Sequence, residues 1–131
     1  MAEAMFFEAR GEEYAGYYAV GRNILKRLET SYRGAENTCE VIHTPSQYSY
    51  LWDDIPDVVM RKELHLYNEI TKLAEKLILQ YATSSLPEYE IGECKGGATH
   101  YHSTTIKDPY WTDSMDQYCG KIGKHKFYIG A

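Results

Sequence analysis

The sequence predicts an α+β fold that is mainly helical, with a small antiparallel β-sheet in the C-terminal half. Apolar side chains recur at helical spacing as far as Tyr81, whereas the residues after Gly96-Gly97 alternate in the manner of strands. The length of 131 residues fits one domain, so we expect residues 1–131 to form a single unit.

Two helices are expected at the start of the chain. Residues 2–9 are strong helix formers, and this first helix should stop near Gly11. From Glu12 to Leu28 the apolar spacing predicts an amphipathic helix, with acidic residues at its start and Lys26-Arg27 at its end. That charge order matches the helix dipole.

The middle of the chain is predicted to be loop and then the longest helix. Residues 30–57 are rich in polar groups, Gly and Pro, so they should be mostly loop, with a short helical piece around residues 39–42. A broad apolar stripe predicts a helix from about Val58 to Tyr81, for which Asp57 is a plausible N-cap.

Two short strands are expected in the C-terminal part. Residues 98–105 are rich in Thr, Tyr and His and alternate with a period of two, and residues 124–129 alternate again. A loop that holds Pro109, Tyr110 and Trp111 should separate the two strands.

Charge and composition exclude several classes of partner. The formal net charge is -5, which argues against a general nucleic-acid binder and against capture by anionic lipid. No stretch approaches the roughly 20 apolar residues of a membrane span, so no membrane insertion is expected. The N-terminus lacks a basic and apolar signal sequence, and we therefore expect synthesis in the cytoplasm.

The three cysteines, Cys39, Cys94 and Cys119, form neither a CxxC pair nor a disulfide framework. One bridge is compatible with this set. Free buried thiols in a reducing cytosol are the favoured expectation.

The N-terminal block contains a candidate catalytic acid. Glu8 follows Phe6 and Phe7, and a carboxyl beside apolar rings loses hydration, which raises its pKa. A carboxyl that stays protonated near neutral pH can protonate a leaving oxygen. By composition alone, a solvated glutamate on a helix surface is the commoner case. Glu12 would share a helix face with Glu8, but Gly11 is expected to break that helix.

Three histidines form a second candidate constellation. His100 and His102 lie two residues apart on an expected strand, and His125 from the neighbouring strand would complete a zinc site. The commoner alternative is that these imidazoles pack and form hydrogen bonds around a sheet. The polar and aromatic stretch Gln47-Tyr48-Ser49-Tyr50 is either a sugar-stacking rim or a loop anchored by its rings.

Four short blocks carry the most specific pattern in the sequence. The blocks are Phe7-Glu8-Ala9-Arg10-Gly11-Glu12 with Tyr14-x-Gly16; Cys39-x-Val41-Ile42-x-x-Pro45-x-Gln47-Tyr48-Ser49; Gly97-Ala98-Thr99-His100-Tyr101-His102 with Pro109-x-Trp111; and Ile122-Gly123-x-His125-x-Phe127-Tyr128. Their ordered set resembles the SleB-like cell-wall hydrolases, which include spore-cortex-lytic enzymes and many phage and bacterial relatives. Any one block is weak, whereas the ordered set is specific and covers most of the chain.

This resemblance implies a lysozyme-like fold and cleavage of peptidoglycan between N-acetylmuramic acid and N-acetylglucosamine. It places the catalytic acid of a lytic transglycosylase on Glu8. That carboxyl would protonate the glycosidic oxygen and then take a proton from the muramic C6 hydroxyl, which closes a 1,6-anhydro ring. Because no water is activated, no second carboxylate is required.

The resemblance also implies which residues surround the acid. Glu12 and His125 would support the cleft, and neither a metal nor a cofactor is expected. The chain departs from the family where Lys26 and Lys124 each replace a usual Asn, and substrate specificity would differ if either position contacts substrate. The residues expected to line the glycan groove are Gln47, Tyr48, Ser49, Thr99, Tyr101 and His102.

Two alternatives of different class stay open. One is a zinc-dependent peptidoglycan amidase or peptidase built on His100, His102 and His125. The other is a wall-binding module that has lost turnover.

For the leading interpretation, the partners would be peptidoglycan glycan strands, and the protein would act as a monomer. It would reach the wall after release from the cytoplasm. If the chain is phage-encoded, as an endolysin, a holin-type partner would permit that release.

Overall fold

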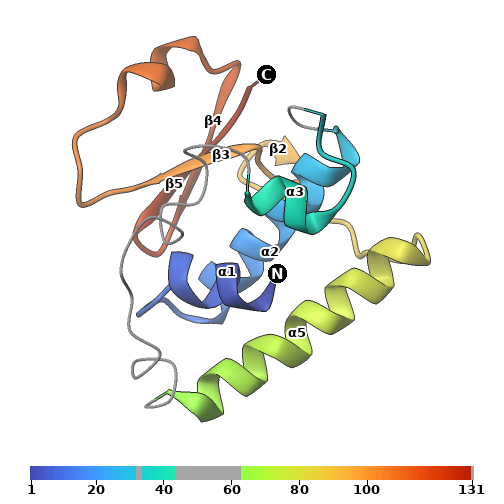
Figure 1. Cartoon of the computed structure of the whole chain (residues 1–131). Helices are drawn as coiled ribbons and strands as arrows, with labels where there is room; N and C mark the ends of the chain where they lie inside the picture. Colours follow the sequence, from blue (N-terminus) through green and yellow to red (C-terminus); the bar gives the residue numbers. More distant parts are fainter. Residues whose placement is uncertain (32–33, 44–62, 131) are drawn as a thin grey trace.

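Helices and strands are segregated along the chain. The structure is a computed structural model that describes residues 1–31, 34–43 and 63–130. Helices dominate the first part and strands the last, which confirms the expected α+β class (Figure 1). The helices are α1 (Ala2–Glu8), α2 (Tyr14–Glu29), α3 (Thr38–Ile42) and α5 (Leu64–Ala82). The strands are β1 (Glu90–Ile91), β2 (Cys94–Lys95), β3 (His100–Ser103), β4 (Gln117–Ile122) and β5 (His125–Ile129), with the 3-10 helix η3 (Tyr110–Ser114) before β4.

The helical part is built around α2. Its buried residues, among them Val20 and Ile24, pack with Phe6 of α1 and Leu77 of α5 in one apolar cluster. Gly21 permits the close approach of the three helices, because a Cβ placed there would lie 2.8 Å from the Leu77 Cδ1 atom. This cluster holds α1, and therefore its C-terminal end, in a fixed place.

The sheet forms a second, smaller layer. Strands β3, β5 and β4 are antiparallel and lie in the order β3-β5-β4, so the last strand is central (Figure 1). Strands β1 and β2 form a separate two-stranded hairpin. The apolar cluster beneath the sheet includes Phe127 of β5, Ile91 of the hairpin and Ala19 of α2.

Two buried polar side chains of α2 join the helices to the sheet. The Asn23 Nδ2 atom donates to the carbonyl of Ala98 at 3.0 Å, and the Arg27 Nε atom donates to the carbonyl of Thr99 at 2.7 Å. Both side chains are buried, so these hydrogen bonds satisfy groups that would otherwise be costly to bury. They fix the backbone directly before β3.

Most expected elements are present, with differences at their ends. The first helix ends at Glu8 and the short helix is present as α3. The long helix α5 begins at Leu64, whereas Asp57 and the expected start at Val58 lie outside the described residues. Among the helices that the structure describes, none is long and apolar enough to cross a bilayer.

Strand β4 was not expected from the sequence. Its pairing with β5 is irregular between Tyr118 and Gly120, and Gly120 has a φ of 144°. An irregularity of this kind shifts the inward and outward alternation, so the period-two signal disappears from the sequence.

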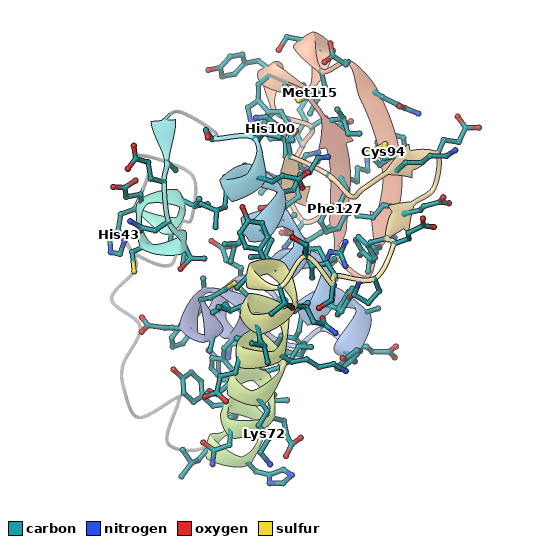
Figure 2. All side chains as sticks on the ribbon, turned by 90° about the vertical axis from the view of Figure 1, so that its right-hand side faces the viewer. His43, Lys72, Cys94, His100, Met115 and Phe127 are labelled. Atoms are coloured by element: carbon teal, nitrogen blue, oxygen red, sulfur yellow. A yellow bond between two sulfur atoms is a disulfide. The ribbon has the colours of Figure 1, made fainter. Side chains whose placement is uncertain are left out.

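The expectation of free buried thiols is wrong for Cys94 and Cys119, and for Cys39 it holds for the free thiol but not for its burial. Cys94 of β2 and Cys119 of β4 form a disulfide, with their Cα atoms 5.3 Å apart, and Cys94 lies beside the strands of the sheet (Figure 2). Cys39 is a free and exposed thiol. The pairing depends on the hairpin and the sheet meeting in three dimensions, which no sequence spacing reveals.

Candidate active site

Glu8 is the last residue of α1. The helix ends there because the chain turns through Ala9 and Gly11, and Gly11 has a φ of 80°, which glycine tolerates best. Glu8 is partly buried, and its Oε1 atom is shielded from solvent. The rings of Phe6 and Phe7 lie edge to face, 5.0 Å apart, immediately before it. One carboxyl oxygen of Glu8 is therefore withdrawn from water, unlike that of a fully solvated surface glutamate.

Glu12 does not share a helix face with Glu8. It lies after the end of α1, in a turn where its backbone N–H donates to the carbonyl of Ala9 at 2.9 Å. The expected break at Gly11 therefore separates the two glutamates. The side chain of Glu12 has an exposure of 5%, so it is almost completely buried.

The Glu12 carboxylate connects the α1–α2 turn to the sheet. Its Oε1 atom accepts a hydrogen bond of 2.7 Å from the backbone N–H of Lys124 and lies 3.2 Å from the Nδ1 atom of His125. Two glycines make room for it: a Cβ at Gly123 would overlap the carboxylate, and one at Gly16 would lie 2.7 Å from the Glu12 Cβ. Gly16 and Gly123, which lie far apart in the sequence, thus make room for the same side chain.

His125 supports Glu12 from the first residue of β5. Burial lowers the pKa of its imidazole, and the Glu12 carboxylate acts in the opposite direction without cancelling the effect. A neutral imidazole donates one hydrogen bond to the carboxylate. The ring of Tyr101 packs edge-on against His125, with centroids 5.3 Å apart. The structure therefore brings together the two expected supporting residues and Tyr101.

The three histidines of the zinc alternative lie on opposite faces of the sheet. His100 pairs with Tyr128 and His102 with Lys126, whereas His125 pairs with Ser103. Directly paired residues share a face and neighbours along a strand alternate, so His125 faces away from the other two. No group of three potential metal ligands occurs within the described ranges, and the zinc interpretation is not supported.

Two residues expected in the glycan groove, Thr99 and His102, form hydrogen bonds within the sheet. His102 is buried and forms hydrogen bonds with the Ser103 carbonyl at 2.9 Å and the Tyr128 hydroxyl at 3.0 Å. The Thr99 hydroxyl accepts from the backbone N–H of Gly130 at 2.9 Å. These contacts hold strands together, and alternation along β3 places His102 on the face opposite Tyr101. Gln47, Tyr48 and Ser49 lie outside the described residues.

Sequence reasoning did not single out Tyr17 and Glu63, which lie near the α1–α2 turn. Burial raises the pKa of the Tyr17 hydroxyl, and the negative charges of Glu63 and Glu12 raise it further. The Arg10 Nε atom lies 3.5 Å from the Glu63 Oε2 atom. Glu63 comes from the start of α5, so only the tertiary structure brings it to this turn.

The chain is similar to known proteins over most of its length. A family model described as cell wall hydrolase matches residues 11–128. A spore cortex-lytic enzyme of Halalkalibacterium halodurans is 31% identical over 127 residues, which are 97% of this chain and 33% of that protein. The chain thus spans about a third of the length of this curated relative.

Two solved structures are similar over nearly the whole chain. The catalytic domain of the Bacillus cereus SleB protein matches with a TM-score of 0.63 and 28% identity, covering 98% of this chain and 85% of that one. The catalytic domain of the germination-specific lytic transglycosylase SleB from Bacillus anthracis matches with a TM-score of 0.60 and 27% identity, covering 98% and 89%.

Proposed function

The chain belongs to the cell wall hydrolase family, and from this premise we propose that it cleaves the glycan strands of peptidoglycan as a lytic transglycosylase. The proposal is supported by relatives that are named a spore cortex-lytic enzyme and a lytic transglycosylase. The bond to be cut joins N-acetylmuramic acid to N-acetylglucosamine.

One observation carries the assignment of the acid. Glu8 lies at the end of α1 with one carboxyl oxygen shielded from solvent. Burial of this kind favours the protonated form of a carboxyl, which is the form that a general acid requires. The proton passes from Glu8 to the glycosidic oxygen as the bond from that oxygen to the muramic C1 breaks. The carboxylate then accepts the proton of the C6 hydroxyl while O6 bonds to C1, so Glu8 is regenerated.

The state of Glu12 supports a mechanism with one working carboxyl. Its Oε1 atom already accepts from Lys124 and lies against His125, so the group is committed to holding the turn. A retaining hydrolase needs a second carboxylate as nucleophile, and an inverting one needs a base for water. Ring closure by the substrate's own hydroxyl needs neither.

The substrate contacts and surroundings of the enzyme are part of the same proposal. Tyr101 lies beside the Glu12–His125 pair. The proposed groove residues are Gln47, Tyr48, Ser49, Thr99, Tyr101 and His102, of which the first three lie outside the described residues. The enzyme acts as a monomer on the wall after release from the cytoplasm. A holin-type partner provides that release if the chain is phage-encoded.

Replacement of Glu8 tests the proposal. Glu8→Gln should lower the rate of glycan cleavage by about 10²–10⁴-fold, because the amide cannot donate the proton. Glu13→Gln, a change of the same kind at an exposed position of the same segment, should retain the wild-type rate.

Purified peptidoglycan is digested with each variant, and mass spectrometry identifies the products. Anhydro-muropeptides are expected from the wild type. Reducing ends that have gained water would contradict transglycosylation, and a loss of only a few-fold in a folded Glu8→Gln variant would remove Glu8 from the acid role.

A further inference from the structure

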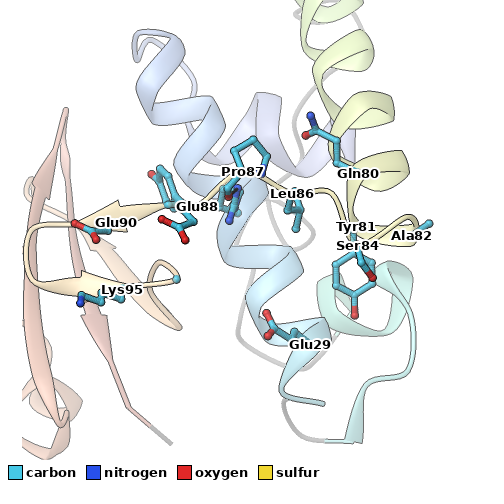
Figure 3. Close-up of a pocket in the computed structure, with 13 residues that line it drawn as sticks. Glu29, Gln80, Tyr81, Ala82, Ser84, Leu86, Pro87, Glu88, Glu90 and Lys95 are labelled. Atoms are coloured by element: carbon cyan, nitrogen blue, oxygen red, sulfur yellow. Dashed lines mark hydrogen bonds between the residues drawn. The ribbon is translucent and has the colours of Figure 1, made fainter.

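A pocket is present whose lining does not include Glu8. It has a volume of about 800 Å³ and runs over α2 from the β1–β2 hairpin to the end of α5 (Figure 3). Its lining includes Arg22, Glu88, Glu90 and Lys95, and does not include Glu8, Glu12 or His125. We call it the Arg22 pocket, and neither the proposed acid nor its supporting residues account for it.

Arg22 is a buried cation that lines this pocket. Its exposure is 8%, and its guanidinium lies 5.0 Å from the centroid of the Tyr89 ring and 5.8 Å from that of Tyr18. Its Nη1 atom donates to the Pro87 carbonyl at 2.8 Å and to the Tyr18 hydroxyl at 3.1 Å. Both of these hydrogen bonds use Nη1, so within the described part of the chain the N–H groups on Nε and Nη2 are available to a ligand.

A guanidinium held in this way favours a carboxylate ligand. The two rings and the two hydrogen bonds fix its plane, so little conformational freedom is lost when a ligand binds. A carboxylate matches the fork of N–H donors, and charge-assisted hydrogen bonds are stronger than neutral ones.

The rest of the lining favours a positively charged group. Glu29, Glu88 and Glu90 carry three negative charges, against the two positive charges of Arg22 and Lys95. Figure 3 shows these glutamates spread along the pocket, with Glu90 on the hairpin and Glu29 on α2. A ligand with a carboxylate and an ammonium group therefore complements the pocket better than an anion or a cation alone.

The hairpin wall of the pocket is held in place before any ligand arrives. Glu90 and Lys95 are paired residues of the β1–β2 hairpin, and the Cys94–Cys119 disulfide ties this hairpin to β4. The Gly96 N–H donates to the Tyr89 carbonyl at 2.7 Å. A wall fixed by these contacts lowers the ordering cost of binding.

We propose that the Arg22 pocket binds the zwitterionic end of a peptidoglycan stem peptide. The ligand carboxylate lies on Arg22, and its ammonium lies among the glutamates of the pocket. A stem peptide that ends in a diamino dicarboxylic acid carries both charges on one residue. The assignment rests on the proposed function, because the wall substrate supplies such peptides beside the glycan that Glu8 cleaves.

Calorimetric titration of the full chain with the tripeptide L-Ala-γ-D-Glu-meso-diaminopimelate tests the assignment. Saturable binding is expected. Acetylation of the side-chain amine of its diaminopimelate residue and amidation of that residue's terminal carboxylate should each weaken binding about tenfold or more, since each removes one charge-assisted contact. Equal affinity for the native and the modified peptides would overturn the proposal.

Variants locate the site independently of the ligand chemistry. Glu88→Gln combined with Glu90→Gln should weaken binding of the native tripeptide about tenfold but leave binding of its acetylated form unchanged. Glu75→Gln, an exposed position of α5 outside the lining, serves as the matched control. In Arg22→Gln, the native and the amidated tripeptide should bind with equal affinity. If that variant does not fold, the double glutamate variant still tests whether the tripeptide binds in the Arg22 pocket. An unaltered affinity in the double variant would place the peptide elsewhere.

Two further measurements identify the source of the ligand and separate this proposal from the cleavage reaction. Free diaminopimelate should bind more weakly than the tripeptide, and equal binding would assign the pocket to a free amino acid instead of a wall peptide. Cleavage of peptide-free glycan strands tests the function of Glu8 alone. Tripeptide binding without glycan cleavage would contradict the proposed function and support the peptide site in the Arg22 pocket. Glycan cleavage without tripeptide binding would support the proposed function and contradict the peptide site.

Discussion

At the scale of single residues, the position of the Glu12 side chain depends on glycines that lie elsewhere in the sequence. Its carboxylate fills the space left by the missing side chains of Gly16 and Gly123 and is held by Lys124 and His125. The sequence places these residues in the first and last blocks of the family pattern. Their common role becomes visible only when the β4–β5 turn meets the α1–α2 turn.

Substitution of Gly123 should displace the Glu12 carboxylate. Gly123→Ala places a Cβ on that group at a φ of 56°, so it combines a left-handed backbone cost with overpacking. We expect the free energy of unfolding to fall by about 2–4 kcal/mol, measured by denaturant melts. Gly34→Ala is the control, because its φ is 79° and a Cβ there would meet nothing within 4 Å. Equal losses in the two variants would contradict the role assigned to Gly123.

At the scale of elements, the stability of the β1–β2 hairpin depends on the Cys94–Cys119 disulfide. It has two residues in each strand, and its buried residues Ile91 and Cys94 join the sheet's apolar cluster. A hairpin this short is marginal without support from its neighbours. The disulfide to β4 and the close approach of Gly92 to the carbonyl of Cys119 provide that support.

Loss of the disulfide should therefore destabilise the protein. The two cysteines are separated by 25 positions. Opening a loop of this size should lower the free energy of unfolding by about 3 kcal/mol. The measurement compares denaturant melts of the wild type with those of a Cys94→Ala, Cys119→Ala double variant. Cys39→Ala removes the exposed free thiol and should leave the midpoint unchanged. A double variant as stable as the wild type would show that the hairpin does not need the tie.

At the scale of the whole molecule, a few polar contacts join two apolar clusters. Asn23 and Arg27 connect α2 to the residues before β3, and the Glu12–His125 pair connects the α1–α2 turn to β5. Polar contacts between packed layers specify one arrangement of the layers, because an unpaired partner would be costly. The acid at the end of α1 is thereby held in register with the sheet.

This coupling predicts a pH dependence of stability. Burial lowers the pKa of His125 below its ordinary value of 6.5, so the folded state favours the neutral imidazole. The contribution of His125 to stability is therefore fully present above pH 6.5 and is lost as the pH falls through the folded-state pKa. NMR titration of the imidazole should give a midpoint below 6.5, and thermal melts of His125→Gln should depend less on pH in that range. A midpoint above 6.5 would mean that attraction to Glu12 outweighs burial.

Local patterns in the sequence determined much of the fold and part of the candidate site. Helix-forming residues predict α1, helical spacing predicts α2 and most of α5, and period-two alternation predicts β3 and β5, because propensity and period both follow from local backbone geometry. The ordered blocks predict the family and place an acid at Glu8.

Only the tertiary structure decided the remaining features. The irregular pairing of β4 removes the alternation by which a strand is predicted from sequence. The Cys94–Cys119 disulfide joins separate elements, and the strand register places His125 on the face opposite His102. The Arg22 pocket likewise combines α2, α5 and the hairpin. Each of these depends on contacts between residues far apart in the chain, and a periodicity read along one segment contains no information about which distant segment will pack against it.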